Sequence, residues 1–167
     1  TNEPFENVWL GNRFENNDHL TVTSVEILWD IYENAHDFVT IDILDNEGNV
    51  LVSSQPFRTY HDSLMTIDVP NLSIDGDFYA MVHWQDNPIS TDALVIDITE
   101  DVPNTAYIMY PGEEPILLSD FLGSPNGSFF VRVNTLVENP ERENREVISY
   151  NIYRGLAENI DEADTWP

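Results

Sequence analysis

The sequence predicts an all-β protein, an antiparallel two-sheet β-sandwich with a jelly-roll-like arrangement of strands. Three observations support this prediction. Apolar and polar residues alternate in segment after segment, as they do in strands that bury one face. Turn-forming residues separate these segments at short intervals. No amphipathic helical pattern continues beyond about two turns, so the strand-helix alternation that builds a parallel sheet is missing.

The first clear strand is "SVEILWD", with Val25, Ile27 and Trp29 on one face and Glu26 and Asp30 on the other. Since successive side chains of a strand point to opposite faces, the apolar face is expected to enter the core. The segment therefore predicts a strand with one buried and one wet face.

A hairpin follows. In "FVTIDIL", Val39, Ile41 and Ile43 alternate with polar residues, and "VLVSS" is a second short β-prone run. The intervening "DNEGN" (45–49) contains the Asp, Asn and Gly residues that tight turns favour. Two alternating runs joined by such a turn indicate an antiparallel pair.

The next strand, "LMTIDVP", places Met65, Ile67 and Val69 on one face and ends at Pro70. The turn Asp75-Gly76-Asp77 then leads into "FYAMVHW". On this strand the core face is expected to carry Phe78, Ala80, Val82 and Trp84. The opposite face carries Tyr79, Met81 and His83. That second face is too apolar for a plain solvent face, so either a loop such as 110–123 covers it or it binds a ligand.

The later strands are expected at 93–99, 106–110, 128–134 and 146–153, and a short helical turn at 116–123. Residues 1–137 are expected to form the sandwich. Residues 138–147 are polar, charged and contain Pro140, as interdomain linkers do. Residues 148–167 are interpreted either as an edge strand or as the truncated start of a fibronectin type III-like domain. An unpaired strand there could exchange with a second copy of the chain.

The charge of the chain is its most extreme property. Six basic and 31 acidic residues give a net charge of −25 over 167 residues, and all six basic residues are Arg. Such a chain repels phosphates and anionic lipids, so nucleic acid is excluded as a partner. The longest apolar runs are far shorter than a membrane span, so insertion into a membrane is not expected.

Two explanations of this acidity remain open, adaptation to high salt and clustered carboxylates that bind calcium. The absence of Lys from the whole chain favours salt adaptation, because a single metal site would not require it. There is also no Cys, which removes disulfides, thiolate nucleophiles and zinc-thiolate sites.

Several segments together resemble a known family. In order, they are "VWLGNRF", "LTVTSVEILW", "VTIDILDNEGNVLVSS", "DGDFYAMVHWQD", "AYIMYPGEE" and "GSFFVRV". This series, over residues 4–135, resembles a jelly-roll module of secreted and cell-surface proteins of the Bacteroidetes. It is similar to cleaved-adhesin and galactose-binding-like domains. The segment "SYNIYRG" (149–155) resembles the opening strand of a fibronectin type III domain.

The resemblance implies a non-catalytic accessory or adhesion role in an exported multidomain protein, located outside the cell or on its surface. It also implies that calcium is a possible cofactor and that the partner is a protein or a glycan. Relatives usually have a further strand before "VWLGNRF", whereas little precedes it here.

Calcium binds six to eight oxygen ligands, including carboxylates and carbonyls. Acidic and amide residues gather in an early segment and in the predicted hairpin turn. The candidate metal ligands are Glu15, Asn17, Asp18, Asp45 and Glu47. The alternative for "DNEGN" is an ordinary Gly-containing turn, because it lacks the spacing of an EF-hand.

A second candidate site lies at the end of the strand "FYAMVHW". Aromatic rings beside polar side chains suit sugars, whose C–H faces stack on aromatics while the rim binds hydroxyl groups. The candidate ligand-binding residues are Tyr79, His83, Trp84, Gln85, Asp86 and Asn87. The alternative is that this strand belongs to the core and is covered by a loop.

An enzyme is not expected. "LGSPNGS" (122–128) does not match the GxSxG nucleophile motif, and no metal-binding histidine spacing occurs. Glycan hydrolysis would require two carboxylates facing each other across a cleft, and a sequence cannot show such a cleft. We therefore expect an attachment module, with a carbohydrate-binding module near Trp84 as the alternative and a glycan hydrolase as the least favoured function.

Overall fold

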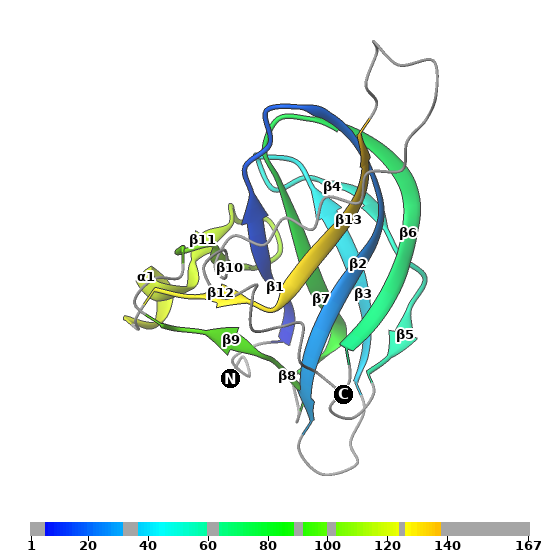
Figure 1. The fold of residues 1–167 in the computed structure, drawn as a ribbon. Helices are drawn as coiled ribbons and strands as arrows, with labels where there is room; N and C mark the ends of the chain where they lie inside the picture. The colour runs from blue at the N-terminus through cyan, green and yellow to red at the C-terminus, as the bar shows by residue number, and fades with distance from the viewer. Residues whose placement is uncertain are drawn as a thin grey trace, which may run out of the picture.

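The structure is a computed structural model, and it describes residues 6–31, 37–59, 64–88, 92–99, 103–123 and 126–137. Over these residues the chain is an all-β, antiparallel sandwich (Figure 1). The predicted linker (138–147), the predicted final strand (146–153) and the fibronectin-like segment (148–167) lie outside the described residues.

The described part of the chain contains thirteen strands and one short helix. The first seven strands are β1 (Glu6–Phe14), β2 (His19–Ile31), β3 (Phe38–Leu44), β4 (Val50–Ser53), β5 (Phe57–Arg58), β6 (Leu64–Asp75) and β7 (Phe78–Pro88). The remaining elements are β8 (Asp92–Leu94), β9 (Ile96–Asp97), β10 (Ala106–Met109), β11 (Ile116–Leu117), α1 (Leu118–Leu122), β12 (Ser128–Phe129) and β13 (Val131–Val137). No helix among these residues is long and apolar enough to cross a membrane.

The two sheets differ in size. The large sheet has the order β11-β10-β1-β7-β3-β4, with β5 also paired to β3. The small sheet has the order β13-β2-β6, with β8 paired to the end of β2. In Figure 1 the strands β13, β2 and β6 lie on one side of the molecule, and β7 and β3 lie behind them. The short pair β9 and β12 stands beside β1.

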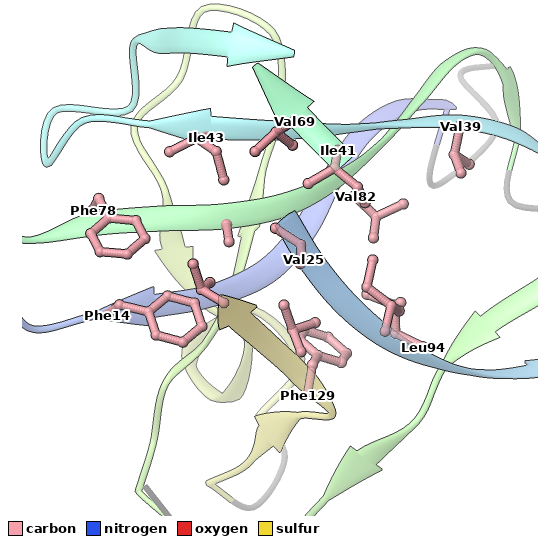
Figure 2. Close-up of a cluster of buried hydrophobic side chains, with 14 of the residues drawn as sticks. Phe14, Val25, Val39, Ile41, Ile43, Val69, Phe78, Val82, Leu94 and Phe129 are labelled. Carbon is pink, nitrogen blue, oxygen red and sulfur yellow. The ribbon is translucent and has the colours of Figure 1, made fainter. Parts of the chain in front are cut away.

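The core lies between the two sheets. The largest side chains without exposed surface include Trp29 on β2 and Phe78 and Trp84 on β7. Figure 2 shows Phe14 and Phe78 side by side, with Val25 and Val82 reaching into the same interior from opposite sheets. Burial of each such side chain stabilises the fold by about 1.5–3 kcal/mol. The predicted core faces of β2, β3 and β7 are thus confirmed.

The hairpin of β3 and β4 also forms as predicted. Two later strands are interrupted where continuous strands were expected. The segment 93–99 divides into β8 and β9, which pair with different partners, and 128–134 divides into β12 and β13 at Phe130. The backbone leaves one sheet and joins another at each break, so neither strand can continue straight.

The two long sides of the sandwich are built differently. On one side, β4 packs against β6 and brings the edges of the two sheets together. On the other side, β13 is the edge strand of the small sheet among the described residues, while the large sheet extends past β1 to β10 and β11. This second side carries the groove described below.

Candidate functional site

The sequence-predicted ligand residues on β7 divide between two faces. Trp84 is 0% exposed, stacks edge-on against Trp29 and donates a hydrogen bond from Nε1 to Asp37 Oδ2 at 3.0 Å. A ring without exposed surface cannot stack on a sugar, so Trp84 is a core residue rather than part of a binding platform. Gln85 is exposed, and the side chains of Asp86 and Asn87 lie outside the described part of the chain.

Tyr79 and His83 lie on the outer face of the large sheet, and both are buried. Tyr79 belongs to a small apolar cluster on this face with Trp9, Leu44, Met81 and Met109. The β3-β4 turn and the loop after β10 meet beside this cluster, because Gly48 lies against both Met109 and Pro115. The apolar outer row of β7 is therefore buried, and the loop after β10 lies beside the cluster.

His83 belongs to a buried polar network on the same face. Its ring stacks on Trp9 with a centroid separation of 3.6 Å. Nδ1 of His83 lies 3.1 Å from Asp42 Oδ2, and Nε2 lies 2.9 Å from Asn7 Oδ1. Trp9 Nε1 donates to the same Asp42 oxygen at 2.7 Å. Asn7 sits at a β-bulge with a φ of 52°, a left-handed conformation that costs energy for a residue with a side chain.

The network keeps Asp42 ionised. Burial alone raises the pKa of this carboxyl. Hydrogen bonds from His83, Trp9 and Ser53, together with the charge of His83, outweigh burial and hold the pKa of Asp42 below its ordinary value of 3.8. An acid-histidine pair makes up two of the three members of a catalytic triad, but here the second ring nitrogen faces an amide instead of a hydroxyl nucleophile. The arrangement is suited to fixing strands β1, β3 and β7 together.

The predicted metal ligands lie in two connections of the chain. Glu15, Asn17 and Asp18 belong to the β1-β2 loop, and Asp45 and Glu47 to the β3-β4 turn. Asp45 closes its own turn, accepting hydrogen bonds from the backbone N–H groups of Glu47 and Asn49. Although burial raises the pKa of Asp45, these bonds and the Asn49 side chain lower it below 3.8. Among the residues that the structure describes, no three acidic, His or Cys side chains converge on a metal position.

The positive charge beside these two connections is the guanidinium group of Arg13. Arg13 Nη2 lies 2.8 Å from Asp77 Oδ2 in the β6-β7 turn and 3.1 Å from Asn46 Oδ1 in the β3-β4 turn. Asp77 Oδ1 also accepts a hydrogen bond from Asn16 N in the β1-β2 loop. Arg13 thus joins the β3-β4 and β6-β7 turns, and Asp77 links them to the β1-β2 loop.

A groove of about 820 Å³ lies at the open side of the described sandwich. One wall comes from the end of β1 and the start of β10, with the segment before it: Asn12, Arg13, Phe14, Glu15, Pro103, Asn104, Thr105 and Tyr107. The other wall comes from the outer face of the small sheet and the β12-β13 segment: Glu26, Leu28, Leu64, Ser128, Phe130, Val131 and Arg132. The groove therefore crosses from one sheet to the other.

Asn12 joins the two walls. Its side-chain amide donates to Phe129 O at 2.8 Å and accepts from Phe129 N at 2.9 Å. These two hydrogen bonds link β1 to β12 in the way that a backbone peptide group would. Asn104 is engaged in a similar way with Ser119 and the backbone of Gly127. The amides that line the groove therefore maintain its shape.

Of the site residues that the sequence predicted, only Glu15 lines this groove. A signal for two others was present in the sequence. Leu28 is an apolar residue at a polar-face position of β2, and "SFFV" breaks the alternation so that Phe129 points inward and Phe130 outward. Apolar residues out of phase with a strand's core face are candidates for a binding surface.

A comparison with protein-family models and a search of curated proteins found no match to this chain.

Proposed function

We propose that this chain is a non-catalytic attachment module of an exported, multidomain bacterial protein, related to the adhesin-like jelly-roll modules, and that it holds its partner in the groove. The observation that carries this proposal is the groove itself, which exposes Leu64 and Phe130 beside paired charges on a strongly acidic protein. Exposed apolar side chains in a concave surface are typical of binding sites.

The state of the polar groups in the groove supports a binding role over a catalytic one. Asn12 and Asn104 are engaged in internal hydrogen bonds, and Thr105 donates to Ser128. Arg132 Nη1 lies 3.0 Å from Glu26 Oε2. Catalysis requires groups aimed at the reacting atoms, whereas these groups are aimed at one another.

Binding can be tested on immobilised chain with a glycan array and an array of short synthetic peptides. A ligand found on either array is expected to be lost by Phe130→Ala and retained by Phe121→Ala, which removes an aromatic ring of similar exposure on α1, outside the groove. Ligands that bind both variants equally would place the partner elsewhere and overturn the proposal.

Glycan hydrolysis is a second candidate because two carboxylates, Glu15 and Glu26, line the same groove. A glycosidase uses such a pair, one as acid and the other as base or nucleophile. The Glu26 carboxylate contacts Arg132 at 3.0 Å, so it is engaged within the protein rather than directed at a substrate. Release of reducing sugar from polysaccharides that stops in both Glu15→Gln and Glu26→Gln would favour the hydrolase over the attachment module.

A further inference from the structure

The groove contains an apolar row that crosses the outer face of the small sheet. Leu28 on β2 is the register partner of Leu64 on β6, and Leu28 N donates to Phe130 O on the other side. Leu64 is 56% exposed and Phe130 37% exposed. These side chains belong to the face opposite the core, so core packing does not explain their apolar character.

Several polar side chains of the lining are engaged within the protein. Each amide and hydroxyl considered above already has a partner within the protein. A sugar needs a rim of available donors and acceptors for its hydroxyl groups, because burying them unpaired costs energy. Aliphatic and aromatic side chains need no such rim, and they match Leu28, Leu64 and Phe130 in character.

The charges of the molecule restrict the partner further. Arg13 is paired with Asp77, and Arg132 with Glu26, so the cations at the groove are neutralised locally. The whole chain carries a net charge of −25. A potential of this sign attracts basic groups and repels acidic ones around the groove.

We propose that the occupant of the groove is an extended segment of a partner protein, in which aliphatic or aromatic side chains alternate with or lie between basic residues. The apolar side chains contact the row of Leu28, Leu64 and Phe130, and the net negative charge of the chain attracts the basic residues. This inference rests on the proposed attachment function and names its ligand class.

A library of short random peptides selected on the immobilised chain tests the inference. Selected peptides are expected to combine apolar residues with Lys or Arg. Leu64→Ser is expected to weaken their binding about tenfold or more, the typical effect of truncating a central contact. Leu122→Ser is the matched control, because Leu122 is 54% exposed on α1 and does not line the groove. Binding is also expected to weaken as NaCl is raised, since salt screens the attraction.

The outcomes separate the two proposals. Selected peptides without basic or apolar enrichment, or equal losses in Leu64→Ser and Leu122→Ser, would overturn the inference. Binding of glycans but not peptides, lost in Leu64→Ser, would overturn the ligand class and leave the attachment function standing. A chain that binds neither library nor glycan array, while both variants keep the wild-type melting temperature, would overturn both.

Discussion

At the scale of single residues, Asp42 is the centre of a buried polar network on the outer face of the large sheet. The carboxylate is 2% exposed and contacts Trp9, Thr40 and His83. A buried charge is tolerated only when partners surround it. The network therefore fixes the relative position of three neighbouring strands.

Asp42→Asn is expected to lower the free energy of unfolding by about 1–3 kcal/mol at neutral pH, because Trp9 and His83 lose a charged acceptor. Urea denaturation measures the change. Asp68→Asn, an exposed aspartate on β6, is the control and is expected to change stability little. A loss in Asp42→Asn no larger than that in Asp68→Asn would contradict the role of the network.

The same residue predicts a pH dependence. The folded pKa of Asp42 is lowered, so its ionisation stabilises the fold above about pH 3.8, the ordinary value, and this contribution is lost as the pH falls through the folded pKa. The stability difference between wild type and Asp42→Asn should therefore narrow below about pH 4. Urea denaturation of both proteins at a series of pH values around 4 measures this stability difference. A constant difference would show that Asp42 does not titrate as inferred.

Gly11 is a position where only glycine fits. A Cβ there would overlap the carbonyl oxygen of Ala80 and lie 2.6 Å from Met81 Cα, and both are backbone atoms. Gly11→Ala is therefore expected to destabilise the protein by about 3 kcal/mol, the upper range for overpacking. Gly127→Ala is a matched comparison in which the nearest atom is the flexible end of Ile96, so its cost should be smaller. Thermal melting of both variants provides the test, and the reverse order would be inconsistent with this packing.

At the scale of elements, the segment that joins β12 and β13 forms part of one wall of the groove. Phe129 enters the core and is held by Asn12, while Phe130 turns outward and its N–H bonds to Val95 O. Because neighbouring side chains of extended backbone point to opposite faces, Phe129 fills the core and Phe130 lines the groove.

Asn12→Leu is expected to destabilise the protein by about 2 kcal/mol or more, because it removes the side-chain amide that bonds to both the buried N–H and the C=O of Phe129. The substitution should also weaken the binding of any ligand in the groove, since Asn12 joins the two walls. Chemical denaturation and ligand titration measure the two effects. The surface change Asn49→Leu in the β3-β4 turn is the control for ligand binding, and equal losses of binding in both variants would separate Asn12 from the groove.

At the scale of the whole molecule, charge repulsion is expected to dominate the response to salt. With 31 acidic residues against six Arg, the folded chain is destabilised by repulsion at low ionic strength. Its melting temperature should rise steeply between dilute buffer and molar NaCl, as the screening length falls from about 10 Å to about 3 Å. Calorimetry at several NaCl concentrations, with and without EDTA, measures the melting temperature. A flat response that becomes steep after EDTA would assign the neutralisation to calcium.

The alternation of residues was sufficient to predict the antiparallel sandwich and the core faces of β2, β3 and β7. This is possible because the side-chain period of a strand is a local property of the backbone. The composition likewise determined the net charge and the absence of thiol chemistry. These properties depend on residue type and near neighbours, so the linear sequence contains them.

The candidate site depended on the tertiary structure. The alternating pattern did not show that Trp84 is fully enclosed, that Arg13 lies between the acidic turns, or that Leu28, Leu64 and Phe130 form one row. Residues of β1, β2, β6, β10 and β13 form the groove, and they are far apart in the chain. Strand order and register bring them together, and these are set by the packing of the whole sandwich, which no local pattern specifies.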